Sequence, residues 1–134
     1  MYLNEMYKVV SMGIEGLNMV TDKVDDKALQ KTLIDALKKY KIYLKDIEES
    51  MEKRKEEVKD ISGFTKMANK VITEVELMDS DDKKIIKMLI LGTNKGIVKL
   101  EELLNKDLDS TEKSFAEKLL KLLEYQIKSW KVYL

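Results

Sequence analysis

Two residue types that serve much of protein chemistry are missing from this sequence of 134 residues, which contains no cysteine and no histidine. Without cysteine there are no disulfide bonds, thiol nucleophiles or thiolate metal sites, and without histidine the commonest metal ligand and general base is lost. Proline is absent too, and glycine occurs five times, so residues that interrupt a helix are rare. The sequence predicts a mostly helical protein. We identify no catalytic residue and expect no cofactor.

An excess of charge of one sign is also lacking, because 25 Lys and Arg residues balance 25 Asp and Glu residues, and Arg54 is the only arginine. Nucleic-acid binding depends on clusters of basic residues and on the two-pronged hydrogen bonds of arginine. Long apolar runs are missing as well: the longest spans residues 88–91, whereas a membrane helix needs about 20 apolar residues. We expect a cytoplasmic protein that binds neither nucleic acid nor membrane.

The residues that are abundant, 44% hydrophobic and 37% charged, match the composition of long helices. Apolar residues recur every three or four positions in four long segments, 2–20, 26–59, 82–105 and 110–134. Ser62 and Gly63 interrupt this pattern, and a shorter apolar period over residues 64–78 predicts a crossover helix. Two hairpins joined by such a connection form an all-α, ferritin-like four-helix bundle, which we predict as one domain over residues 1–134.

Each long segment carries one predicted core face. These faces are Leu3, Tyr7, Val10, Ile14, Leu17 and Thr21; Leu29, Leu33, Ala36, Tyr40, Tyr43, Ile47 and Met51; Ile86, Leu89, Thr93, Ile97, Leu100 and Leu104; and Phe115, Leu119, Leu122, Gln126, Trp130 and Tyr133. Asp25 is predicted to cap the second helix, and residues 109–112 (Asp-Ser-Thr-Glu) have the form of a capping box. Residues 52–57 have no apolar member, so we expect them to extend beyond the bundle.

Four of the polar residues on these faces form a predicted core polar layer: Tyr40, Tyr43, Thr93 and Gln126. A buried hydroxyl or amide without a hydrogen-bond partner costs roughly 1–3 kcal/mol. We therefore expect these side chains to bond to one another, to a backbone carbonyl or to water. A remnant ligand pocket is the alternative interpretation.

Two aromatic residues near the C-terminus, Trp130 and Tyr133, also have two interpretations. They pack in the core or, if the last helical turn extends past its neighbours, form an exposed anchor for a partner.

Glycines inside helices also have two interpretations, because each costs about 1 kcal/mol relative to alanine and something must offset that cost. The first interpretation is that the missing side chain lets two helices approach closely, and the second is a bulge or a ligand contact. The glycines concerned are Gly13, Gly16, Gly92 and Gly96.

Four short segments carry a resemblance to a known family: residues 13–17 (Gly-Ile-Glu-Gly-Leu), 25–29 (Asp-Asp-Lys-Ala-Leu), 62–63 (Ser-Gly) and 81–83 (Asp-Asp-Lys). With these segments at this spacing, nearly the whole chain resembles the PA2169-type, DUF2383-like family of bacterial ferritin-like four-helix bundles. The resemblance implies a role in stress or sporulation physiology. It also makes a di-metal carboxylate site in the bundle core the obvious functional hypothesis.

A di-metal site of that kind needs a glutamate from each of two helices and a Glu-x-x-His motif from each of the other two, all pointing inward. The sequence has no histidine, and no carboxylate lies on any of the four predicted core faces. We therefore expect the ligand set to be lost and no metal to bind. The alternative is a carboxylate-only metal site that uses Glu15 with Glu48, Glu49 or Glu124 turned into the core.

These observations predict a non-enzymatic helical bundle that acts through its surface, as a protein-interaction module or as a homo-oligomer. The missing metal-ligand set and the four complete core faces support this hypothesis. The alternative is a ferritin-like oxidoreductase or metal-storage protein that binds metal through carboxylates alone. A bundle that opens onto lipid is disfavoured, because acidic and basic residues are interspersed rather than gathered on a lysine-rich face.

Overall fold

A computed structural model describes residues 2–58, 70 and 81–134 of the chain. Its helices are α1 (Leu3–Val20), the short 3-10 helix η1 (Thr21–Lys23), α2 (Lys27–Lys53), α4 (Asp82–Leu104) and α5 (Ser110–Lys131). The four long helices are those expected from the apolar period, although α2 ends at Lys53 rather than near residue 59. The crossover helix predicted over residues 64–78 lies outside the described residues, apart from the helical Lys70.

The polar residues that start α2 and α5 have clear roles. The Asp26 side chain accepts a hydrogen bond from the backbone N–H of Leu29 at 2.9 Å, so Asp26 caps α2. The prediction that Asp25 is the cap is wrong by one residue, because the helix begins at Lys27 and the cap is the residue just before it. The capping box of α5 is present, because Asp109 and Glu112 each accept from the backbone N–H of the other, at 2.9 and 3.1 Å.

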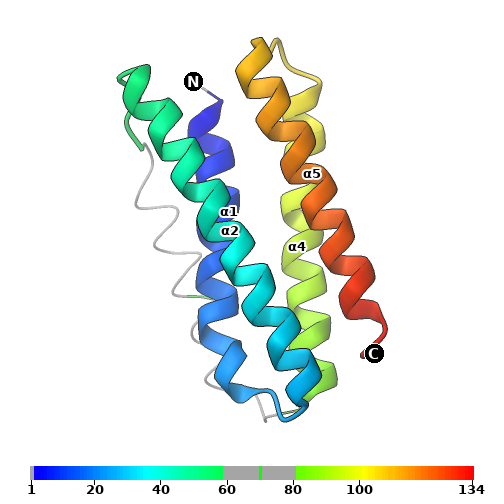
Figure 1. The fold of residues 1–134 in the computed structure, drawn as a ribbon. Coiled ribbons are helices and arrows are strands. Elements are labelled where there is room, and N and C mark those ends of the chain that lie inside the picture. The colour runs from blue at the N-terminus through cyan, green and yellow to red at the C-terminus, as the bar shows by residue number, and fades with distance from the viewer. Residues whose placement is uncertain (1, 59–69, 71–80) are drawn as a thin grey trace.

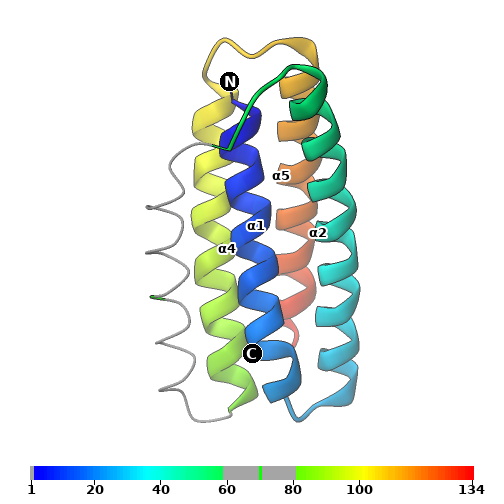
Figure 2. The same cartoon turned by 90° about the vertical axis from the view of Figure 1, so that its left-hand side faces the viewer.

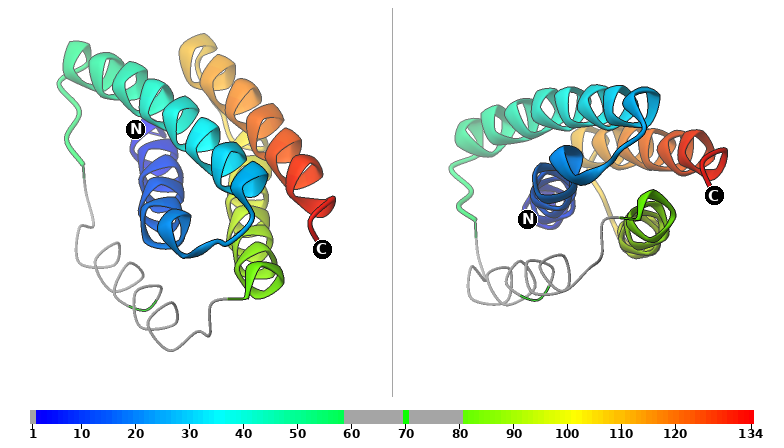
Figure 3. Two further views of the ribbon diagram at one scale, coloured as in Figure 1. Left: turned by 60° about the horizontal axis from the view of Figure 1, so that its bottom comes forward. Right: turned by 90° about the horizontal axis from the view of Figure 1, so that it is seen from below.

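The four long helices form two antiparallel hairpins, α1–α2 and α4–α5 (Figures 1 and 2). One layer holds α1 and α4 and the other holds α2 and α5, as the view from below shows (Figure 3). Because α2 and α4 run in the same direction, the end of α2 and the start of α4 lie at opposite ends of the bundle. The all-α, four-helix prediction is confirmed. No described helix is both long enough and apolar enough to span a membrane.

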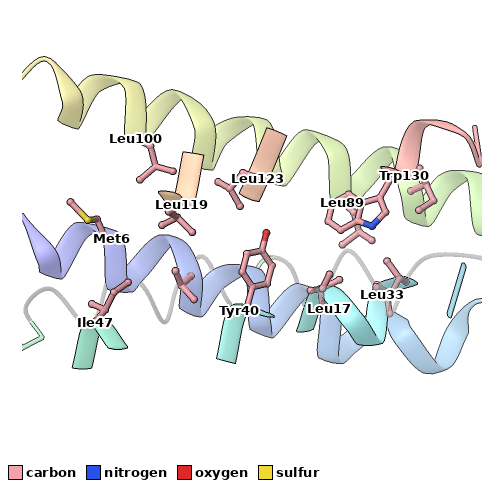
Figure 4. Packing of buried hydrophobic residues seen from close by; sticks show 14 of the residues in the cluster. Met6, Leu17, Leu33, Tyr40, Ile47, Leu89, Leu100, Leu119, Leu123 and Trp130 are labelled. Carbon is pink, nitrogen blue, oxygen red and sulfur yellow. The ribbon is translucent and has the colours of Figure 1, made fainter. Parts of the chain in front are cut away.

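Buried apolar side chains from all four helices meet in one core (Figure 4). The predicted core face of α2 is buried except at Tyr43, which is half-buried. The buried face of α5 is centred further round the helix than predicted, so the predicted Phe115 and Leu122 lie at its edge and are half-buried. The buried residues of α5 are Glu112, Ala116, Leu119, Leu123, Gln126, Ile127 and Trp130.

The end of α2 is tied across the bundle to the start of α5. The Nη1 and Nη2 atoms of Arg54 donate to the two carboxylate oxygens of Asp109 at 2.8 and 3.0 Å, a two-pronged ion pair. Glu112 in turn accepts from the backbone N–H of Tyr2 at 2.9 Å, so the start of α1 joins the same cluster. The expectation that residues 52–57 extend beyond the bundle is therefore wrong at Arg54, which pairs with the residue that caps α5.

A second tie lies at the opposite end of the bundle. Asp82, the first residue of α4, accepts from the backbone N–H groups of Asp25 and Asp26 at 2.9 and 3.0 Å. These two residues belong to the loop that joins α1 to α2. Arg54, at the end of the α1–α2 hairpin, bonds to the turn between α4 and α5. Asp82, at the start of the α4–α5 hairpin, bonds to the turn between α1 and α2. The two hairpins are held together at both ends of their length.

Candidate interaction surface between α2 and α5

α2 and α5 run antiparallel as neighbours, yet they touch each other far less than the helices within each hairpin do. Two contacts set their register. Arg54 bonds to Asp109 near one end, and Lys39 Nζ lies 4.9 Å from the centre of the Tyr125 ring. We call the surface strip where the two helices meet the α2–α5 seam. It comprises Thr32, Asp35, Ala36, Lys39, Ile42 and Tyr43 of α2, and Phe115, Leu122, Tyr125, Gln126, Ser129 and Val132 at α5.

Part of the seam is hollowed into a groove of about 220 Å³. One wall is the first half of α2, with Thr32, Asp35, Ala36 and Lys39. The other is the C-terminal end of the chain, with Tyr125, Gln126, Ser129, Trp130, Val132 and Tyr133. The groove therefore combines apolar and aromatic side chains with one acidic and one basic group at its mouth.

Helical spacing extends the seam beyond the groove. Two turns of helix contain about seven residues, so side chains seven apart lie on one line. Tyr43 lies on the line of Ala36, and both Phe115 and Leu122 lie on the line of Ser129. Because Ala36 and Ser129 line the groove, these half-buried side chains continue the seam toward the other end of the bundle. All three side chains are partly buried and pack against the core.

Three large apolar side chains stand well exposed at the edges of the seam. Ile42 is 62% exposed, Tyr125 59% and Val132 77%. Tyr125 and Val132 line the groove, and Ile42 lies seven residues after Asp35, which lines it too. An apolar surface that is continuous rather than scattered marks a binding face more often than a solvated one.

Two buried polar groups lie behind the groove. Gln126 is only 3% exposed, and neither its amide oxygen nor its amide nitrogen has a hydrogen-bond partner in the described part of the chain. The indole Nε1 of Trp130, one turn further along, is also buried without a partner there. Among the described residues, Gln126 therefore has neither of the protein partners that we expected for it, another residue of the layer or a backbone carbonyl.

Tyr40 and Thr93, two other residues of that predicted layer, do meet. Their side chains form a hydrogen bond in the core, and the Tyr40 ring crosses the core toward α4 (Figure 4). Burial raises the pKa of the Tyr40 hydroxyl far above its ordinary value, and the hydrogen bond with Thr93 opposes that shift. The phenol therefore stays neutral at physiological pH and supplies no base. Tyr43, by contrast, lies at the seam.

The two candidate anchor residues at the C-terminus have different surroundings. Trp130 is 1% exposed and belongs to the core (Figure 4), so its interpretation as an exposed anchor is wrong. The reason is that α2 and α4 both begin at the end of the bundle where α5 finishes, so the last turns of α5 have neighbours. Tyr133 is half-buried and lines the groove.

The glutamates proposed as an alternative metal-ligand set all point to solvent. Glu15, Glu48, Glu49 and Glu124 are exposed. Within residues 2–58, 70 and 81–134, no three acidic side chains lie close enough together to hold a metal ion. The structure therefore does not bring these four residues together.

Comparisons with known proteins give no further identification. No protein-family model matches the chain, and neither a curated protein nor a solved structure matches it significantly. The family resemblance inferred from sequence therefore finds no support in them. The four-helix arrangement is what the structure itself shows.

The exposed seam residues Ile42, Tyr125 and Val132 are the ones that sequence reasoning does not single out. They lie off the predicted core faces, where an isolated apolar residue needs no explanation. A weak signal exists: Tyr125 and Val132 are seven residues apart, so they form a second apolar line on α5. That line becomes meaningful only when the position of α2 beside it is known.

Proposed function

We propose that this protein is a non-enzymatic helical bundle that acts by binding another protein along the α2–α5 seam. The observation that carries the proposal is the presence of half-buried and exposed apolar side chains on two neighbouring helices that touch sparsely. Aromatic residues at the centre and charged residues at the rim are the composition of protein-protein interfaces. Tyr43 and Phe115, which are half-buried, supply such a centre.

The titratable groups with shifted pKa values support a non-enzymatic role. In the described residues they are Tyr40, Arg54 and Asp109. Burial in the core accounts for the first, and the structural ion pair at the end of α2 accounts for the other two. Catalytic groups usually have shifted pKa values in a cleft, and none of these three lines the groove.

We include in this proposal that the four-helix bundle has a ferritin-like topology. The parallel direction of α2 and α4 supports a ferritin-like topology with one long crossover. The resemblance read from the sequence places such a module in stress or sporulation physiology. In this proposal the bundle keeps the ferritin-like arrangement and uses its surface in place of a metal centre.

Site-specific cross-linking in the cells that naturally make the protein tests the seam. A photoreactive benzoylphenylalanine replaces Ile42 or Tyr125 in two variants, and Glu101, exposed on α4, in a matched control. We expect adducts of one common mass from both seam positions and none from the control. Val132→Asp, at the rim of the groove, should reduce both adducts. Equal cross-linking from all three positions, or none from the seam, contradicts the proposed function.

A further inference from the structure

We propose that the groove between α2 and the end of α5 binds a small uncharged molecule with a lactam edge, the class to which free pyrimidine bases belong. This inference goes beyond the proposed protein interaction, because it concerns the groove alone and does not require the seam to bind a protein. It rests on three buried polar atoms that have no hydrogen-bond partner in the described part of the chain.

The three atoms belong to two residues that line the groove. They are the amide oxygen and amide nitrogen of Gln126 and the indole Nε1 of Trp130. Gln126 and Trp130 are four residues apart on α5, so their side chains are neighbours on one face of the helix. A buried polar atom without a partner lowers stability. A ligand that supplies the missing hydrogen bonds removes that penalty, so the two residues favour a polar occupant over a purely apolar one.

The kinds of atom define the polar edge that fits them. The amide oxygen of Gln126 accepts a hydrogen bond, whereas its amide nitrogen and the indole nitrogen of Trp130 only donate. A carbonyl oxygen has two lone pairs, so the carbonyl group of a lactam can accept from both nitrogens while the adjacent ring N–H donates to the Gln126 oxygen. Glutamine amides pair with nucleic-acid bases through two such hydrogen bonds. One lactam edge therefore satisfies all three atoms.

The rest of the groove fits the body of such a molecule. Tyr125 and Tyr133 give the groove aromatic walls, on which a flat ring can stack. The volume of about 220 Å³ is smaller than the roughly 300–1,000 Å³ of sites for drug-sized ligands, so the ligand is small. Asp35 and Lys39 carry opposite charges at the mouth, so together they favour neither an anion nor a cation. An uncharged single ring meets these conditions.

Access to the three atoms requires a movement of the side chains around them, because the atoms are closed to solvent. Tyr125 and Val132, which line the groove, are largely exposed. Exposed side chains change rotamer within nanoseconds, and α2 and α5 touch each other sparsely along this strip. Movement of these two side chains widens the groove and leaves the buried core in place.

Trp130 is the only tryptophan of the chain and provides a direct readout. Its indole N–H gives one signal in a proton–nitrogen correlation NMR spectrum, which is followed while uracil is added to the full chain. We expect the signal to shift and to saturate with a Kd of about 1 mM or lower. A uracil with a methyl group on both ring nitrogens keeps its carbonyl groups but has no N–H. It should bind at least about tenfold more weakly, because it cannot donate to the Gln126 oxygen.

Gln126→Leu separates a binding site from a purely structural role. This variant should bind uracil at least about tenfold more weakly, yet its midpoint of urea unfolding without ligand should rise, because a buried amide without a partner is removed. Gln30→Leu is the matched control, because the Gln30 amide donates to the Thr21 carbonyl at 3.0 Å and does not line the groove. It should leave uracil binding unchanged and should not raise the midpoint. Circular dichroism checks that both variants are folded.

Three results overturn the inference. If uracil causes no saturable shift of the Trp130 signal, ordered water alone satisfies the amide and the indole. If uracil and its dimethyl form bind equally, or if Gln126→Leu binds uracil as well as the unmodified chain does, the lactam edge is not what the groove recognises. Failure here is separable from failure of the proposed function, because the cross-linking test detects a protein at Ile42 and Tyr125 and uses no uracil.

Discussion

Gly13 of α1 lies against the ring of Tyr40 from α2, and replacing this glycine by alanine tests how tightly that contact is packed. A Cβ atom at Gly13 would lie 2.8 Å from Cε2 and 3.0 Å from Cζ of the Tyr40 ring. The ring cannot easily move aside, because it is buried and its hydroxyl is bonded to Thr93. The first interpretation of this glycine, close helix approach, is therefore the one that the structure supports.

Two opposing effects set the magnitude. Alanine is favoured over glycine inside a helix by about 1 kcal/mol, whereas forcing an extra methyl group into a packed core costs typically 1–3 kcal/mol. At 2.8 Å the contact is shorter than any normal carbon-carbon contact, so the cost should exceed the gain. We expect Gly13→Ala to lower the free energy of unfolding by up to about 2 kcal/mol.

Gly16 provides a control three residues along the same helix. No atom lies within 4 Å of a Cβ built there, so Gly16→Ala should raise the free energy of unfolding by up to about 1 kcal/mol. Urea unfolding followed by circular dichroism measures both variants. In a Tyr40→Leu background the ring is gone, and Gly13→Ala should become neutral or stabilising. If Gly13→Ala stabilises the unmodified protein as much as Gly16→Ala does, the packing argument is refuted.

Three further predictions concern polar groups. Gln126→Leu should raise the free energy of unfolding by about 1–3 kcal/mol, because it removes a buried amide without a partner; a lower value in urea unfolding would mean that the amide is bonded. Asp82→Ala should lower it by about 1–2 kcal/mol through the loss of two hydrogen bonds to the α1–α2 loop, whereas Glu101→Ala should not. Arg54 holds the pKa of the Asp109 carboxyl well below its ordinary value of 3.8, so the ionised form stabilises the fold above that value. This stabilisation is lost as the pH falls through the folded pKa, and Arg54→Met should show a smaller acid-induced loss than the unmodified chain.

Sequence periodicity predicts the helices well because it reports a local property. On α2 the residues from Leu29 to Met51 that repeat at helical spacing are nearly all buried. Each helix has only one face with enough apolar area to be buried, and the absence of proline leaves the pattern unbroken. The capping box at Asp109 is equally local, since both partners lie within one turn.

The seam and the ties could not be predicted in the same way, because both depend on pairs of segments far apart in the chain. Arg54 and Asp109 are 55 residues apart, and nothing near either residue indicates the other. Tyr43 and Leu122 look like core residues, since they lie on apolar faces. Whether such a residue is covered depends on how closely α2 approaches α5, and a one-dimensional pattern carries no information about the distance between two helices.

The ties and the seam have related consequences for binding. Arg54 fixes the end of α2 to the start of α5, and Asp82 fixes the α1–α2 loop at the opposite end. α2 is therefore constrained near both of its ends, although its contacts with α5 along the seam are sparse. A surface that is already held in place loses little conformational freedom when a partner binds, so more of the contact energy appears as affinity. The polar clusters at the ends thus stabilise the fold and also hold the α2–α5 seam in a single arrangement, which favours the partner binding that we propose.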